Sequence, residues 1–192
     1  NETREDGKAS GKNITISKEL SDDDLLKLWE DHLSGQQSVG IVAIDEDNKC
    51  VWGAIDVDEY QLDLKDLAIK IAKQELPLVL CRSKSGGAHI YMFLSEPVAA
   101  SMVQRKLRQI AAAIGYGQVE IFPKQTKLLL DRGDRGSTLN MPYFGGENST
   151  RYAYGKEGQA LTPEEFLNYC NEIELKPSTL ERLEASPLNE TM

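Results

Sequence analysis

Hydrophobic positions in the middle of the chain switch several times between the two-residue period of a strand and the period of about 3.6 residues typical of a helix. Four segments are predicted as strands: 49–56, 77–82, 89–94 and 118–122. Two segments between them place their apolar residues on one face of a helix: 62–75 and 98–114. A Gly-rich turn, SKSGGA, joins the second and third strands, and Pro97 is expected to end the third.

This β-α-β-β-α-β order predicts an α+β domain with a split βαβ core of the RRM/ferredoxin-like type. An extra strand over 39–44 is predicted in front of the core, as a hairpin with 49–56. A helix capped by Ser21 is expected to precede that hairpin, through DDDLLKLWEDHL. Behind the core, Thr162 and Glu165 form a capping box for a helix over 163–173.

The two ends of the chain lack hydrophobic periodicity. Residues 1–14 are polar and are expected to form a mobile leader, and residues 176–192 a tail or linker to a missing domain. One folded domain is therefore predicted over 15–175. Because the chain begins with Asn1 and not with Met, we expect it to be a fragment of a longer protein.

Composition excludes several classes of protein. The chain has 192 residues, 40% hydrophobic and 28% charged, which suits one domain with a real core. A net charge of -9 excludes a general basic coat for a polyanion, so any contact with nucleic acid must be local. Three scattered cysteines and two histidines exclude a zinc finger or a disulfide scaffold and favour a reducing, intracellular setting. No apolar run approaches the roughly 20 residues of a membrane helix, so a soluble protein is expected.

The segment AIDVDEY places Asp56 and Asp58 two residues apart at the end of a strand, so both carboxylates leave the same face of the sheet. Two close carboxylates repel each other unless a cation lies between them. Hard oxygen ligands of this kind suit Mg²⁺ or Mn²⁺ with phosphate oxygens as further ligands. The alternative is a strand that ends in an ordinary acidic loop.

The segment RSKSGGAH combines cations, hydroxyls and glycines in a turn that ends at His89. Glycines let backbone N–H groups approach phosphate oxygens, and the serine hydroxyls add donors, so the turn is typical of an anion-binding loop. An ordinary hairpin turn with a half-buried histidine is the alternative. The other histidine, His32, is expected on the surface of its polar helix.

Glu120 lies on the strand VEIF and points away from its apolar neighbours. Lys124, Arg135 and Asn140 follow in a Gly-rich stretch that could equally be a solvated loop. From residue 82 to 135 the chain has nine Lys or Arg against four Asp or Glu. This local excess of +5 in an acidic chain concentrates positive charge around the candidate site. Asp131 is interpreted as a partner for neighbouring arginines and not as a ligand.

The segments AIDVDEY, RSKSGGAHIYMFLSEPV, VEIFPKQ and LNMPYFGG, in this order, resemble the archaeo-eukaryotic primase superfamily, in particular the primase-polymerases of phages, plasmids and bacterial conflict systems. The resemblance covers about residues 35–155. It implies a cytoplasmic enzyme, in a bacterial or phage-infected cell, that performs template-directed nucleotidyl transfer. The partners implied are single-stranded or primed DNA, an NTP or dNTP, and a helicase or accessory domain.

The resemblance also implies a set of site residues. It assigns Asp56, Asp58 and Glu120 as catalytic ligands of two Mg²⁺ or Mn²⁺ ions. It assigns the serines of the turn and His89 to the incoming nucleotide, and because SGGAH is one residue shorter than in many members, Ser83 is included beside Ser85. We further expect Lys124 or Arg135 on triphosphate oxygens and Asn140 on the sugar or base.

Two other functions are compatible with parts of the sequence. A metal-dependent nuclease of the D...ExK type would need a lysine two residues after Glu120, whereas Lys124 follows by four. A rolling-circle nuclease would need a second histidine beside His89, and HIY supplies only one. A non-catalytic module for single strands would need stacking aromatics on the sheet, which Tyr91 and Phe93 could supply.

Overall fold

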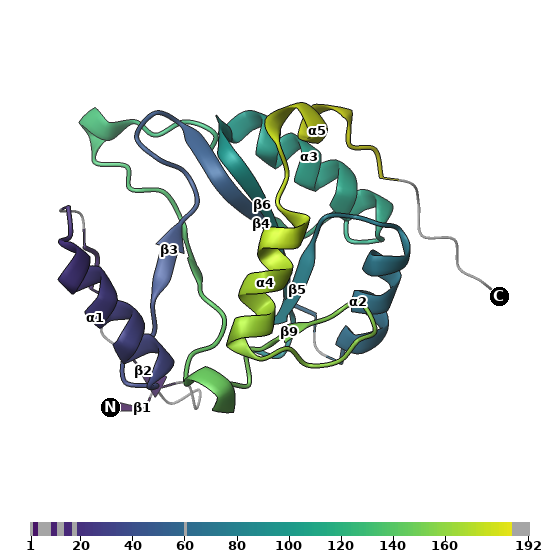
Figure 1. Ribbon diagram of the computed structural model, residues 1–192. Coiled ribbons are helices and arrows are strands. Elements are labelled where there is room, and N and C mark those ends of the chain that lie inside the picture. The colour runs from purple at the N-terminus through teal and green to yellow at the C-terminus, as the bar shows by residue number, and fades with distance from the viewer. Residues whose placement is uncertain (1, 4–8, 11–13, 17–18, 60, 186–192) are drawn as a thin grey trace.

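The computed structural model describes residues 2–3, 9–10, 14–16, 19–59 and 61–185. At its centre is an antiparallel five-stranded sheet (Figure 1). Its strands lie in the order β7 (Glu120–Phe122), β4 (Lys49–Val57), β6 (Ala88–Ala99), β5 (Val79–Arg82) and β9 (Ala153–Tyr154). β4 lies between β6 and β7 and is antiparallel to both, as a split βαβ core requires. The α+β class and the order of the six core elements are thus confirmed.

Two helices cover one face of this sheet, α2 (Leu64–Lys73) and α3 (Ala100–Ala113). Both are amphipathic, and the apolar face of α3 is fully buried at Val103 and Leu107. Gly53 permits this close packing, because a Cβ there would lie 2.7 Å from the Leu107 side chain. This face carries the larger of the two hydrophobic clusters.

The opposite face of the sheet is covered at one end only. There a short ribbon of β3 (Gly40–Val42) and β8 (Thr138–Asn140) and the helix α4 (Pro163–Ile173) enclose a second hydrophobic cluster. Helix α4 crosses in front of the sheet in Figure 1. The predicted capping box is confirmed at its start, where Thr162 and Glu165 bond reciprocally.

The predicted hairpin of 39–44 with 49–56 is wrong. β3 pairs with β8, with Ile41 opposite Leu139, and belongs to a separate two-stranded sheet. The turn between β3 and β4 is closed by the bond from the Asp45 N–H to the Lys49 carbonyl, but no ladder follows it. Ile41 and Leu139 both pack on the second cluster, which explains the preference for a partner almost 100 residues away.

Two boundaries in the predicted core also differ. Pro97 does not end β6, which continues to Ala99. The β4–β6 register shifts between Cys50 and Trp52, and β6 pairs with β4 at Phe93 and again at Val98. Pro97, which has no N–H to donate, therefore falls in the gap of the ladder. Helix α3 accordingly begins at Ala100 and not at residue 98.

The C-terminal segment from 176 is not a tail where the structure describes it. Helix α5 (Pro177–Arg182) packs against β6, and Leu180 is fully buried. The Lys106 ammonium donates to the carbonyls of Glu181 and Leu183 near the end of this helix. Residues 186–192 lie outside the described part. Of the predicted leader, the structure describes Ile14 and two short paired strands, β1 (Glu2–Thr3) and β2 (Ala9–Ser10).

Helix α1 (Asp22–Leu33) has the predicted Ser21 cap, which accepts a bond from the Asp24 N–H. His32, predicted on its surface, is instead fully buried. The Val39 N–H donates to its Nδ1 at 3.0 Å, so its Nε2 donates to the Pro142 carbonyl at 2.8 Å. His32 thus joins α1 to β3 and to the loop after β8. No helix in the described residues is long and apolar enough to cross a membrane.

Candidate active site

Three polar side chains lie side by side where β4, β6 and β7 meet. In the register of the sheet, Asp56 is directly opposite His89 on one neighbour and directly opposite Glu120 on the other. This is the placement expected from the strand order, since a central antiparallel strand shares its end with the starts of both neighbours. Ile121 points into the helix-covered cluster, so Glu120 emerges on the opposite face with Asp56.

Asp56 is held in an environment that disfavours its charge. Its side chain is only 12% exposed, and its Oδ1 is buried without a hydrogen bond from any described residue. Burial, together with the charges of Asp58 and Glu120, raises the pKa of Asp56 to about 6, against the opposing effect of Lys124. A buried carboxylate oxygen without a donor is a group that a cation would stabilise.

His89 is buried and neutral at pH 7, because burial lowers its pKa to about 4. The Tyr91 hydroxyl donates to the Asn140 carbonyl, so its oxygen accepts from His89 Nδ1, 3.3 Å away. This network assigns the ring proton to Nδ1. The lone pair of Nε2 then faces Asp56 Oδ1 at 3.4 Å, and the contact is neither an ion pair nor a hydrogen bond.

The turn between β5 and β6 lies tightly against the end of β4. A Cβ on Gly87 would stand 2.1 Å from the Val57 carbonyl oxygen, so only glycine fits there. The hydroxyl of Ser83 is 3.1 Å from that of Ser85, which in turn donates to Asp58 Oδ1 at 3.4 Å. The turn and the carboxylates of Asp56 and Asp58 therefore form one continuous polar surface.

Glu120 is more exposed than Asp56 and contacts the Lys124 ammonium, which also lies 5.0 Å from the centre of the Phe122 ring. Lys124 follows Glu120 by four residues, and the bend at Pro123 directly after β7 brings its ammonium to the Glu120 carboxylate. In this arrangement, no three His, Cys, Asp or Glu side chains of the described residues form a metal-binding group.

Arg151 is a functional candidate that the sequence analysis missed. Its side chain is buried, with one nitrogen donating to Ser38 Oγ at 3.1 Å and its guanidinium over the Phe144 ring at 4.9 Å. Among the described residues it has no carboxylate partner, and its charge helps to lower the pKa of His89. Nothing in the local sequence STRYA marks this residue, because its partners come from the segment before β3 and the loop after β8.

The remaining predicted residues are less closely placed. Asn140 approaches His89 and Tyr91 with its backbone carbonyl, while its own side chain is exposed on β8. Arg135 is exposed, and no described residue that lines the site bonds to it. Asp131 is exposed in a short 3-10 helix (Leu130–Arg132) and forms no ion pair with a described arginine, contrary to expectation.

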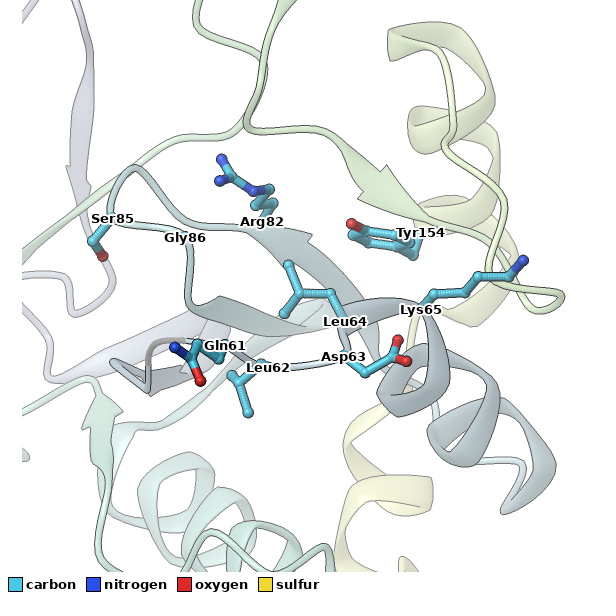
Figure 2. A pocket seen from close by; sticks show the side chains of 9 residues that line it. All are labelled: Gln61, Leu62, Asp63, Leu64, Lys65, Arg82, Ser85, Gly86 and Tyr154. Carbon is cyan, nitrogen blue, oxygen red and sulfur yellow. The ribbon is translucent and has the colours of Figure 1, made fainter.

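A polar hollow of about 630 Å³ lies on the β5–β9 side of the turn (Figure 2). Figure 2 shows Arg82 and Tyr154 on one side of it, the start of α2 on the other and Ser85 at one end. The Arg82 guanidinium donates to the Thr150 carbonyl at 3.3 Å. Ser85, which lines this hollow, also bonds to Asp58, so the hollow lies next to that carboxylate.

The fold and the site together define an α+β domain with carboxylates, a histidine and a glycine-rich turn at one end of an antiparallel sheet. The family described as the archaeo-eukaryotic primase domain of TOTE conflict systems matches residues 7–173. The chain belongs to this family, which confirms the resemblance found in the sequence. A search of curated proteins gives no match.

Proposed function

We propose that this domain is a primase-polymerase, which joins a nucleoside triphosphate to a 3′-hydroxyl under the direction of a DNA template. Family membership supports a nucleotidyltransferase. The observation that carries the proposal is the alignment of Asp56, His89 and Glu120 across three adjacent strands, next to the turn at Ser85.

Asp56, Asp58 and Glu120 would hold two Mg²⁺ or Mn²⁺ ions. Their oxygens are the hard donors that these cations prefer, and the undonated Oδ1 of Asp56 fits this use. When bound, such ions lower the pKa of the attacking hydroxyl and stabilise the charge that develops on the α-phosphate. Lys124 would then move from Glu120 to phosphate oxygens.

The turn would bind the triphosphate through its backbone N–H groups and the hydroxyls of Ser83 and Ser85. His89 offers a lone pair at Nε2 in this structure, so it must gain a proton before it can donate to a phosphate oxygen. An anionic triphosphate beside the ring raises its pKa and favours that proton. Arg151, a buried cation without an anionic partner among the described residues, adds a further phosphate-binding group.

In the reaction, the 3′-oxygen forms a bond to the α-phosphorus while the bond from that phosphorus to the β-phosphate oxygen breaks. Pyrophosphate leaves, and the hydroxyl proton passes to water. The protein mainly positions the reactants and stabilises charge, as in other phosphoryl transfers. Asn140 on the sugar or base and Arg135 on the triphosphate stay predictions that no contact in the structure supports.

A module that binds single strands by stacking on the sheet is disfavoured by the packing. Tyr91 is 2% exposed and stacks on Phe93, which itself packs against Phe166 of α4. These rings are therefore covered by β8 and α4, and bases cannot stack on them without displacing α4. The nuclease alternative keeps its four-residue spacing from Glu120 to Lys124, although the turn after β7 brings the two side chains into contact.

The test is extension of a labelled primer on a DNA template by the purified domain with Mn²⁺ or Mg²⁺ and nucleotides. A ladder of longer products that EDTA abolishes and Asp58→Asn removes is the expected result. Shortened primers would indicate the nuclease. Binding of the DNA without any change in its length, under conditions in which the domain is folded, would contradict the proposal.

A further inference from the structure

A second, smaller hollow lies on the other side of the carboxylates, at the β7 edge of the sheet. It has a volume of about 280 Å³. Its lining comes from the end of α3, the segment before β7 and the turn after it: Arg108, Gln118, Val119, Glu120, Ile121 and Lys124. Glu120 is thus part of both the candidate metal site and this hollow. The two hollows flank the carboxylates from opposite edges of one sheet.

Arg108 is the cation of this hollow that is not already paired. Lys124 contacts Glu120, whereas the Arg108 side chain forms no hydrogen bond or ion pair with any residue that the structure describes. At 100° per residue, Arg108 lies about 40° around α3 from Gln104, whose amide donates to the Pro123 and Lys124 carbonyls. Arg108 therefore faces the β7 edge, while Arg105 lies on the outer side of the same helix.

The chemistry of the proposed reaction decides which substrate lies at which edge. In nucleotidyl transfer the attacking oxygen and the leaving pyrophosphate lie roughly in line on opposite sides of the α-phosphate. Of the groups proposed to bind the triphosphate, the turn and His89 lie on the β6–β5 side of Asp56, and Lys124 alone reaches the phosphates from the β7 side. The hydroxyl that attacks must then approach from the opposite side, where β7 and its hollow lie.

We infer that the hollow at the β7 edge holds the 3′ end of the primer strand, with Arg108 on a backbone phosphate of the terminal nucleotides. This assignment rests on the proposed function for the direction of attack. A hollow of 280 Å³ is too small for a whole nucleotide in a closed pocket but accommodates a phosphate and sugar at an open edge. An exposed arginine is also the side chain best suited to a phosphate, through its planar fork of donors.

The first test measures DNA binding without nucleotide or divalent metal, by fluorescence anisotropy of a labelled primer–template. Arg108→Ala is expected to weaken binding about fivefold and to reduce the slope of log K against log salt by about 0.9, as loss of one phosphate contact requires. Arg105→Ala removes the same charge from the same helix and is the matched control, with binding and slope as in the wild type. Equal behaviour of the two variants would overturn the inference.

The second test locates the primer end directly. A primer that ends in 4-thiothymidine is photo-cross-linked to the wild-type domain, and the modified peptide is identified by mass spectrometry. Cross-links within 104–124 support the inference, and cross-links confined to 61–65 or 82–86 at the other hollow contradict it. Failure of the proposed function is distinguishable from failure of this inference. A wild-type protein that cross-links at 104–124 but never extends a primer would contradict the proposed activity and still support the primer-binding surface.

Discussion

The face of the central sheet that is opposite to α2 and α3 has an aromatic end and a polar end. Strand β6 contributes side chains to both. On β6, His89, Tyr91 and Phe93 alternate on this face. Tyr91 and Phe93 stack at 5.9 Å beneath β8 and α4, whereas His89 lies at the polar end beside Asp56. Two strand positions therefore separate a packed aromatic end from a polar end.

The two ends differ in whether their groups satisfy one another. At the aromatic end the buried Tyr143 hydroxyl donates to the Leu161 carbonyl and accepts from the Ala153 N–H, so its polar atom is fully paired. At the polar end the carboxylates of Asp58 and Glu120 repel that of Asp56, whose Oδ1 has no donor among the described residues. The aromatic end therefore stabilises the fold, whereas the polar end leaves a buried carboxylate oxygen unpaired.

The largest effect is expected for activity at the polar end. Asp56→Asn should reduce primer extension by at least about 10²–10³-fold, because it removes the charge of a carboxylate proposed to hold the metal ions. Its free energy of unfolding should be unchanged or higher than that of the wild type, since one of three mutually repelling carboxylates is gone. Extension assays measure the loss of activity, and denaturant unfolding of the same preparation measures the change in stability.

Asp66→Asn is a suitable control, because Asp66 lies on α2, exposed and paired with Lys70. It should leave extension unchanged. Retention of most activity in Asp56→Asn would contradict the proposal of a two-metal site at this end of the sheet.

The reverse result is expected at the aromatic end. Phe93→Ala should lower the free energy of unfolding by about 2–3 kcal/mol, somewhat less than for a fully buried ring, because it opens a space between Tyr91 and Phe166. Extension per folded molecule should stay within about twofold of the wild type at temperatures well below unfolding. If Phe93→Ala abolished extension in a folded protein, the division into a stabilising and a functional end would fail.

The polar end could be predicted from the sequence because it needs only local patterns and one topological rule. The alternation along AIDVDEY and VEIF fixes the face of each carboxylate, and the β-α-β-β-α-β order makes Asp56 a neighbour of both His89 and Glu120. Metal binding by these residues stays a prediction, since the structure places them without testing it.

The covered end could not be predicted, because its partners are far apart in the chain. β3 pairs with β8 through Ile41 and Leu139, and nothing within 39–56 indicates that choice. His32 lies in a polar helix, and its burial depends on Pro142 and Phe144, which lie more than 100 residues away in the chain. Arg151 was missed for the same reason, since its burial depends on Ser38 and Phe144.

His89 lies at the border of the two ends, and a smaller effect is expected there. His89→Ala should raise KM for the nucleotide about tenfold through loss of one charge-assisted bond to the triphosphate. The affinity for primer–template should not change, because the primer end is proposed at the opposite edge. Steady-state extension and anisotropy measure the two quantities. An equal loss of DNA affinity would place His89 in a strand-binding surface and not in a nucleotide site.

The smallest effect concerns the dependence of stability on pH, measured by denaturant unfolding in EDTA between about pH 4 and 7. The folded pKa of Asp56, about 6, lies above its ordinary value of 3.8, so the folded state binds the proton more tightly and stability falls as the pH rises through this window. The folded pKa of His89, about 4, lies below its ordinary 6.5, so the unfolded state binds the proton more tightly and stability rises over nearly the same window.

The two slopes oppose each other in the wild type, and single substitutions should separate them. Relative to the wild type, Asp56→Asn should gain stability between pH 4 and 6, and His89→Gln should lose stability between pH 4 and 6.5. Each change is expected to be on the order of 1 kcal/mol, because water at the uncovered end of the sheet screens part of the effect. Taking differences between variants cancels the titration of His32, whose pKa burial also lowers. Difference curves that are flat in both variants would show that the polar end is hydrated like an ordinary surface, and the contrast with the aromatic end would then rest on packing alone.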